Sequence, residues 1–196
     1  MSDEPFRCFG GSDPLYADYH DREWGRPVTD ERALLERICL EGFQSGLSWL
    51  TILRKRDGFR AAFANFDPET LATYGDGDVE RLLQDAAIIR HRGKIEATIA
   101  NGRATAELHA SGGTLRELLW SYAPGTTPPP VKTLHELPPV TSESTALSKE
   151  LKKRGFRFIG PTTAHAAMQA CGVVNDHLAQ CPVRDDVERE RNTVLK

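Results

Sequence analysis

Two pairs of cysteine and histidine residues stand near opposite ends of this 196-residue chain. Cys8 and His20 form the N-terminal pair, and His177 and Cys181 form the C-terminal pair. If His177 and Cys181 lie on a helix, their spacing places both side chains on one face. Two thiolates and two imidazoles make a closed tetrahedral zinc site of the structural type, with no position left for a reactive water. The spacing leaves a second interpretation open, in which Cys8 is incidental and His177 is exposed.

The rest of the cysteine pattern narrows the class of protein. Cys39 and Cys171 lie in apolar runs, so we expect them to be buried as small hydrophobic side chains. The sequence has no Cys-x-x-Cys pair, which excludes the ligand set of the zinc nucleobase deaminases. The N-terminus has no basic start followed by an apolar stretch, and no apolar run approaches the ~20 residues of a spanning helix. We therefore expect a cytoplasmic protein.

A carboxylate at position 41 is the second feature that could do chemistry. Glu41 lies in the run 38–43, which is apolar on nearly all sides, as in a buried helix. If that helix stays regular past Gly46, Glu41 and Trp49 share one of its sides with Ile38 and Ser45. A buried carboxylate is costly unless it is hydrogen-bonded or protonated. Glu41 is therefore either a partner in a structural ion pair or a group that recognises the amines of a ligand.

The third feature is a basic turn between two expected helices. In the segment 151–163, Gly155 and Gly160 bracket a short turn, cations surround it, and Pro161 begins the next helix. This pattern is typical of a helix-hairpin-helix, in which backbone N–H groups and a helix N-terminus face a phosphate. An ordinary turn between two helices is the alternative. With four cations nearby we favour binding to a nucleic-acid backbone, although the formal net charge of −3 does not itself indicate it.

The elements that must position these residues are helices. Capping residues and apolar spacing predict a helix after Asp30, a short helix from Pro68 to about Tyr74, one capped by Asp78, and a long one after Gly93. Three more helices are expected over 114–122, 143–153 and 161–171. Alternating runs typical of strands are missing, so the expected class is all-α.

The chain is expected to form one domain. The proline-rich stretch 124–144 is interpreted as an extended connector on the surface, because neither side of it holds enough helices for its own core. We expect residues 1–184 to be that domain and the highly charged residues 185–196 to be a disordered tail.

Taken together, the motifs resemble the 3-methyladenine DNA glycosylase I family, a branch of the helix-hairpin-helix glycosylases. The resemblance spans Cys8 to Cys181 and is carried by five blocks, at 13–25, 38–49, 88–95, 154–160 and 170–177. It implies a helical glycosylase fold in which one zinc ion, bound by Cys8, His20, His177 and Cys181, joins the N- and C-terminal segments.

The resemblance also implies the remaining site residues. Glu41 is the residue implied for catalysis, and the base pocket is formed by Tyr19, Trp24, Glu41 and Trp49. Leu47 would enter the gap that the flipped nucleotide leaves in the duplex. The expected DNA contacts are Leu47, Gly155, Phe156, Gly160 and Thr162.

The implied activity is hydrolytic excision of N3-methyladenine from alkylated double-stranded DNA, which leaves an abasic site without cutting the strand. We expect a monomer. Related glycosylases of the superfamily use an aspartate at about the place where Asn175 stands here, and the adjacent Asp176 is not assigned that role. The alternatives are a damaged-DNA binder without turnover and a zinc-stabilised interaction domain.

One departure from the family pattern bears on base recognition. Family members carry a tryptophan shortly after the first cysteine, whereas this chain has Cys8-Phe9-Gly10-Gly11. Either one aromatic wall of the pocket is missing, or Phe9 supplies it from a shifted position.

Overall fold

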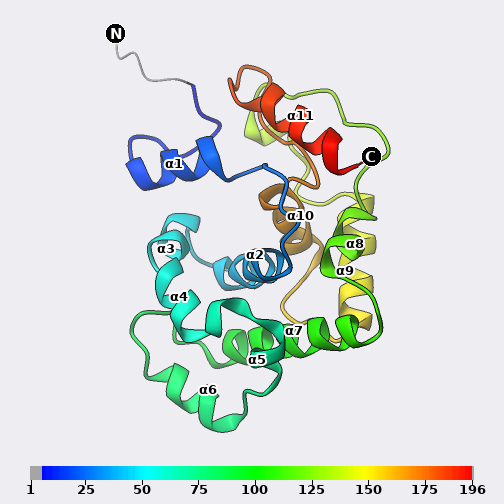
Figure 1. Ribbon diagram of the computed structural model, residues 1–196. Helices are drawn as coiled ribbons and strands as arrows, with labels where there is room; N and C mark the ends of the chain where they lie inside the picture. The colour runs from blue at the N-terminus through cyan, green and yellow to red at the C-terminus, as the bar shows by residue number, and fades with distance from the viewer. Residues whose placement is uncertain (1–5, 196) are drawn as a thin grey trace.

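A computed structural model describes residues 6–195, and every regular element within them is helical (Figure 1). The expected all-α class is therefore confirmed. The α-helices are α1 (Pro14–Arg22), α2 (Glu31–Gln44), α3 (Trp49–Arg54), α4 (Arg56–Ala62), α5 (Pro68–Ala72), α6 (Asp76–Leu83), α7 (Arg92–Ala110), α8 (Leu115–Trp120), α9 (Ser142–Lys153), α10 (Pro161–Ala170) and α11 (Arg184–Val194). Two short 3-10 turns, η1 (Ala64–Phe66) and η2 (Leu134–Glu136), complete the described elements.

Helix α2 is the centre of the molecule. It contacts α3, α7, α8 and α10, and Figure 1 shows it surrounded by the other helices. Its residues from Ile38 to Phe43 are all buried, which agrees with the apolar pattern of that run. The ring of Phe43 packs on Phe59 of α4, with ring centroids 4.6 Å apart. Any residue on the middle of α2 is therefore held rigidly.

The expected helix starts are confirmed to within two residues, with one exception. The Asp30 and Asp67 carboxylates accept hydrogen bonds from the first turns of α2 and α5, as their positions predict. Asp78, expected as the cap of α6, lies instead in its first turn, and its carboxylate accepts a hydrogen bond from the Gly75 amide. The helix begins earlier than expected because that carboxylate can cap it from inside the turn.

The charged C-terminal segment is a helix, so the expectation of a disordered tail at 185–196 is wrong for its described part. Helix α11 buries Val187 and the entire Arg191 side chain. The Arg191 guanidinium donates to the backbone oxygens of Gly172 and Val173 and forms an ion pair with Glu188. Because its charge is paired and its donors are satisfied, this arginine can anchor the helix from inside the protein.

Segments from the N- and C-terminal parts of the described chain are in contact, because the Leu178 amide donates to the Cys8 sulfur at 3.3 Å. Figure 1 shows the N-terminal segment and α11 in the same upper part of the molecule. The connector lies beside them, and the amide of Ala179 donates to the Val131 oxygen at 2.8 Å. Within the described residues, no helix is long and apolar enough to cross a membrane.

Candidate active site

A cavity of about 230 Å³ opens between α1, α2, α3, α10 and the connector. Its walls combine aromatic rings, two leucines and three polar side chains. They are Phe9, Tyr16, Tyr19, Trp24, Glu41, Gln44, Trp49, Leu134, Leu137, Ala166 and Gln169. The cavity therefore contains all four residues that the sequence assigned to a base pocket. We call it the base cavity.

Five of the eleven residues that line the base cavity are aromatic. Tyr19 and Trp49 are in contact across it, with ring centroids 5.3 Å apart. Phe9 packs edge-on against Trp24 at 4.9 Å and also touches Tyr16. Phe9 thus lines the cavity, which answers the question that the missing tryptophan raised. Flat rings on several sides suit a planar heterocycle.

Glu41 is the buried acid of the cavity. Its side chain belongs to the rigid centre of α2, and only 7% of the residue is exposed. Burial raises the pKa of the Glu41 carboxyl to about 8, and the charge of Arg37 opposes this only in part. No described residue donates a hydrogen bond to the carboxylate, so it is not a member of a structural hydrogen-bonded pair. Its ionised form therefore needs a partner that enters the cavity.

The indole N–H of Trp49, like the Glu41 carboxyl, is a buried polar group without a hydrogen-bond partner in the described part of the chain. Its Nε1 is buried and has no hydrogen-bond partner among the described residues. Buried donors without partners are rare in folded proteins and call for an explanation at the site where they occur. Trp49 lines the base cavity and also a smaller cavity beside Arg37 and Arg56.

Trp49 reaches the cavity by a different path from the one expected. Helix α2 ends at Gln44, and Trp49 begins α3 after a turn in which Gly46 has φ +81°. The assumption of one regular helix through Gly46 is wrong, because glycine there adopts a left-handed conformation that ends it. The turn leaves Leu47 40% exposed, on the outside of the break.

A buried lysine fixes this turn. The Lys94 ammonium, on α7, donates to the backbone oxygens of Phe43 and Ser45 at 2.8 and 2.6 Å. These carbonyls belong to the C-terminal end of α2, where a positive charge is favoured. Burial lowers the pKa of Lys94. Lys94 therefore ties the segment that carries Leu47 to α7.

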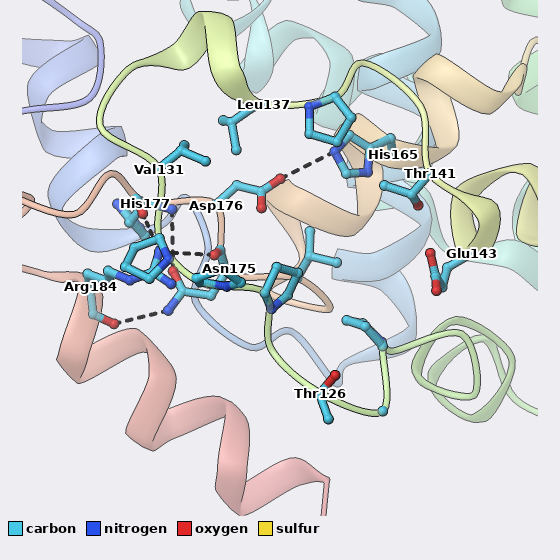
Figure 2. A pocket seen from close by; sticks show the side chains of 17 residues that line it. Thr126, Val131, Leu137, Thr141, Glu143, His165, Asn175, Asp176, His177 and Arg184 are labelled. Atoms are coloured by element: carbon cyan, nitrogen blue, oxygen red, sulfur yellow. Dashed lines mark hydrogen bonds and ion pairs between the residues drawn. The ribbon is translucent and has the colours of Figure 1, made fainter.

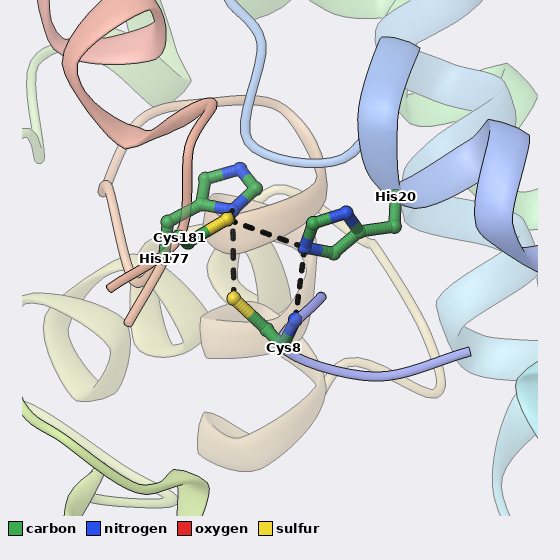
Figure 3. Close-up of side chains that lie close together, drawn as sticks. All are labelled: Cys8, His20, His177 and Cys181. Atoms are coloured by element: carbon green, nitrogen blue, oxygen red, sulfur yellow. Dashed lines mark hydrogen bonds between the residues drawn. The ribbon is translucent and has the colours of Figure 1, made fainter. Parts of the chain in front are cut away.

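The four cysteine and histidine residues predicted to bind zinc form one cluster (Figure 3). All four are buried, and their potential ligand atoms lie within 4.8 Å of one another. The Cys181 sulfur is 3.3 Å from His177 Nδ1 and 3.6 Å from His20 Nε2. The expectation that His177 and Cys181 lie on a helix is wrong, because α10 ends at Ala170 and a turn carries both.

The surroundings of the cluster suit a tetrahedral metal site. His20 Nδ1 is 2.8 Å from Asp21 and His177 Nε2 is 3.0 Å from the Trp24 oxygen, so the other nitrogen of each ring faces the two sulfurs. His20 Nε2 also accepts a hydrogen bond from the Cys8 amide at 3.2 Å. The pKa of the Cys181 thiol is lowered by hydrogen bonds from Cys8 and both histidines, while that of Cys8 is raised by the same contact and by burial. Two thiols and two oriented imidazoles are the donors that zinc prefers.

The hairpin between α9 and α10 differs in detail from its expected role. The amides of Gly155 and Phe156 donate to the Lys152 and Leu151 oxygens and close the end of α9, with Gly155 at φ +93°. The Phe156 side chain is buried in the core. These two residues therefore cannot offer amides or a side chain to a phosphate, and their expected DNA contacts are corrected.

The second half of the hairpin does have free backbone donors. Among the described residues, the amides of Ile159, Gly160 and Thr162 donate no hydrogen bond, and Thr162 is exposed at the start of α10. No protein atom lies within 4 Å of where a Cβ on Gly160 would stand, so a ligand can approach its backbone. Asn101 of α7 holds the turn from behind, because its side chain bonds both backbone groups of Arg157.

Asn175 and Asp176 lie outside the walls of the base cavity. The Asn175 amide donates to Glu188 and to the Arg184 oxygen, which makes it part of the attachment of α11. Asp176 accepts a hydrogen bond from Gln169. Burial acts to raise the pKa of Asp176, but the neighbouring His165 and Gln169 lower it below its ordinary value.

Several lining residues were not found from the sequence. Tyr16 and Gln44 stand within the quoted blocks, so the helical spacing of Tyr16 to Tyr19 and of Glu41 to Gln44 could have indicated them. Leu134 and Leu137 come from the connector, and Ala166 and Gln169 come from α10. Nothing in the local pattern of these last four indicates a cavity, because only the tertiary fold brings them to it.

Comparison with known proteins agrees with this geometry. Residues 9–185 match the family model of methyladenine glycosylase. The chain is 54% identical over 179 residues to DNA-3-methyladenine glycosylase 1 of Escherichia coli (strain K12), covering 89% of this chain and 95% of that protein. It is 45% identical over 182 residues to the DNA-3-methyladenine glycosylase of Haemophilus influenzae, covering 91% and 97%.

Solved structures show the same fold. A crystal structure of 3-methyladenine DNA glycosylase I has a TM-score of 0.87 and 50% identity, covering 90% of this chain and 98% of that one. The enzyme from Staphylococcus aureus, solved to explain 3-methyladenine recognition, has a TM-score of 0.85 and 36% identity, with 90% and 95% covered. On the extent of these matches, the chain belongs to the methyladenine glycosylase family.

Proposed function

We propose that this chain removes N3-methyladenine from alkylated double-stranded DNA by flipping the nucleotide into the base cavity and hydrolysing its glycosidic bond. The observation that carries this proposal is the Glu41 carboxyl, buried without a partner among aromatic rings. The names of the relatives supply the substrate class. A base inside a duplex must leave the stack before an enzyme can act on it, so a ring-lined cavity that opens to the surface is the expected receptor.

The cavity favours this damaged base over an intact one for an electrostatic reason. Methylation at N3 places a positive charge on the base of the nucleotide. The faces of Tyr19 and Trp49 attract such a charge, with about 1–2 kcal/mol per contact away from water. The same charge favours ionised Glu41, whose pKa is otherwise raised to about 8 by burial. A neutral adenine offers neither gain.

Glu41 then has two tasks in the proposed reaction. As an acceptor it holds the exocyclic amine of the base, and as a negative charge it stabilises the positive charge on the base and sugar as the bond lengthens. The glycosidic bond of the methylated nucleotide is already weak, so little proton transfer is needed before water attacks the sugar carbon. No lysine is among the lining residues, so we expect no Schiff base and no strand cutting.

The DNA itself would be held on both sides of the cavity opening. We propose that exposed Leu47 enters the gap left by the flipped nucleotide, as apolar wedges do in proteins that unstack bases. We propose that the free amides around Gly160 and Thr162 bind a backbone phosphate at the N-terminus of α10. The nearby cations Lys152, Lys153 and Arg154 would add sequence-independent attraction.

We further propose that the buried cluster binds one zinc ion through Cys8, His20, His177 and Cys181. With four protein ligands, the metal would serve to cross-link the two ends of the chain and would take no part in the reaction. The support is the donor set and the orientation of both imidazoles by Asp21 and the Trp24 carbonyl.

The test of the activity uses DNA treated with an N-methylating agent. After incubation with the purified protein, the released bases are separated by chromatography. We expect free 3-methyladenine well above the amount lost spontaneously, and strands that stay intact until the abasic sites are cleaved chemically. Tight binding to the methylated DNA with no base release would show a catalytically silent binder instead.

A further inference from the structure

Helix α10 presents one polar side chain to the base cavity, that of Gln169. Its amide Nε2 donates to Asp176 Oδ2 at 2.7 Å. A carboxylate can only accept hydrogen bonds, so the nitrogen of this amide must face Asp176. The Oε1 atom of Gln169 accepts no hydrogen bond from any described residue. The amide is therefore held in one orientation, with an unused acceptor.

Asp176 has a second contact on α10 besides Gln169. It is mostly buried, and its Oδ2 lies 3.2 Å from Nε2 of His165, whose own side chain is almost fully buried. His165 and Gln169 stand four residues apart on α10 and therefore lie on one face of the helix. Asp176, in the chain that follows α10, contacts both of them.

This polar group separates two cavities. A second cavity of about 280 Å³ lies beside the base cavity, lined by prolines of the connector and by His165 and Asp176. Figure 2 shows Asp176 reaching toward His165 in this second cavity, with Leu137 close by. Leu137 lines both cavities. Gln169 lines the base cavity, whereas its partner Asp176 lines the second cavity.

We infer that Gln169 is a specificity-determining residue that offers its Oε1 to the exocyclic amine of the base, and that Asp176 is the positioning residue that keeps it so oriented. The inference rests on the proposed function and extends it. An adenine-type base carries an amine donor at C6, whereas a hypoxanthine- or guanine-type base carries a carbonyl oxygen there. An acceptor held in one orientation binds the amine of an adenine-type base and repels the carbonyl oxygen of the other two types.

Glu41 alone makes this distinction only while its carboxyl is ionised. A carboxyl group that titrates near neutral pH accepts from an amine when ionised, but donates to a carbonyl oxygen when protonated. The Gln169 amide could do the same by turning over, and the carboxylate of Asp176 prevents that turn. Discrimination between an amine and a carbonyl therefore requires a group that can only accept, such as the Gln169 Oε1 atom held in place by Asp176.

The test compares two free bases, 3-methyladenine and 3-methylhypoxanthine, which differ in the group at C6 and in the proton that the second carries on N1. Their dissociation constants can be measured from the fluorescence of the tryptophans in the cavity. We expect Gln169→Leu to weaken binding of 3-methyladenine roughly three- to tenfold, the usual range for one neutral hydrogen bond. Binding of 3-methylhypoxanthine should stay the same or tighten. The matched control is Gln84→Leu, at an exposed glutamine that ends α6, and it should change neither constant.

The positioning role of Asp176 is tested by exchanging which of Gln169 and Asp176 donates and which accepts the hydrogen bond between them. In Asp176→Asn the new amide can donate or accept, so Gln169 is no longer held in one orientation and selectivity should fall. The double variant Gln169→Glu/Asp176→Asn restores one donor facing one acceptor and leaves a carboxylate oxygen toward the base. We expect it to regain preference for 3-methyladenine. Metal content is measured for each variant, because His177 adjoins Asp176.

Two results would overturn the inference. One is an equal loss of affinity for both bases in Gln169→Leu, which would mark a purely structural residue. The other is unchanged selectivity in Gln169→Leu or in Asp176→Asn. A wild-type protein that fails to bind or release 3-methyladenine at all would instead overturn the proposed function, so the two failures are distinguishable.

Discussion

At the scale of single residues, Glu41 links the stability of the protein to its proposed activity. The free energy of burying its carboxyl is reflected in a pKa of about 8, against an ordinary value of 4.5. Between these two values the folded chain keeps the proton while the unfolded chain has released it. The free energy of unfolding should therefore fall as the pH rises from about 5 to 8.

Glu41→Gln removes this dependence because its side chain does not titrate. We expect the variant to gain stability relative to the wild type as the pH rises through that window. The gain should reach a few kcal/mol, with an upper limit of about 5 kcal/mol from the size of the shift. Denaturant unfolding of both proteins at several pH values measures it. Parallel stability curves across the window would show that Glu41 is ionised in the folded protein.

The sequence indicated some site residues and not others for clear reasons. Glu41 stood out because a carboxylate in an apolar helical run is an anomaly that local pattern alone exposes. Leu134 and Gln169 did not stand out, since a leucine in a loop and a glutamine on a helix are ordinary. Their role depends on the path of the connector and on the angle between α10 and α2. Those are tertiary features that spacing does not encode.

At the scale of elements, the turn between α2 and α3 is the part that would enter the DNA. Leu47→Ala should weaken binding to DNA that contains an abasic site, because the apolar wedge that fills the gap is shortened. Stability should change little, since the side chain is already exposed. The control is Leu195→Ala, at a similarly exposed leucine near the C-terminus. A lower melting temperature with unchanged DNA affinity would identify Leu47 as part of the core.

Lys94 should also affect binding to abasic-site DNA, although it lies on α7 and acts through the turn that carries Leu47. Lys94→Met keeps most of the side-chain length but removes the two hydrogen bonds to the Phe43 and Ser45 oxygens. We expect weaker binding to abasic-site DNA together with a loss of stability of about 1–3 kcal/mol, because two buried carbonyls lose their donor. In a Leu47→Ala background the further loss of DNA affinity should shrink, since the wedge is then already absent. Fully additive effects on affinity would contradict a shared role.

The hairpin and the pair His177 and Cys181 show what a local sequence pattern can and cannot determine. The glycines at 155 and 160 correctly indicated a turn between two helices. The pattern could not tell that Gly155 closes α9 while Gly160 leaves its backbone open. Similarly, a helix was expected to bring His177 and Cys181 together. In the structure a turn after α10 does so instead.

At the scale of the whole molecule, the two ends of the chain depend on one small cluster. If zinc binds there, Cys181→Ser should lower its content from one ion per chain to almost none and lower the melting temperature clearly. Excision per folded molecule should be much less affected, because the cluster does not line the base cavity. The control is Cys39→Ala, which alters a buried cysteine that lies outside the cluster. Equal metal content in both variants and in the wild type would refute the assignment.

Helix α11 shows why the high content of charged residues did not indicate the structure of the C-terminal segment. Charged residues dominate 185–196, and such segments are commonly disordered. Here Arg191 is fully buried with Glu188 and two backbone oxygens as partners, and Val187 of the same helix is also fully buried. Amino-acid composition cannot show that one arginine has all its partners inside the protein. Arg191 nevertheless holds α11 against the loop at Gly172 and Val173, which precedes the Cys/His cluster.

The most direct test of the account is single-turnover release of 3-methyladenine by the wild type and by Glu41→Ala. We expect the variant to fold, as circular dichroism would verify, and to excise up to roughly a hundredfold more slowly, the effect of losing a charged acceptor worth about 2–3 kcal/mol. Glu41→Gln should lose less, because it keeps the size and one acceptor. If folded Glu41→Ala releases the base at the wild-type rate, Glu41 does not act on the base and the account of the cavity is wrong.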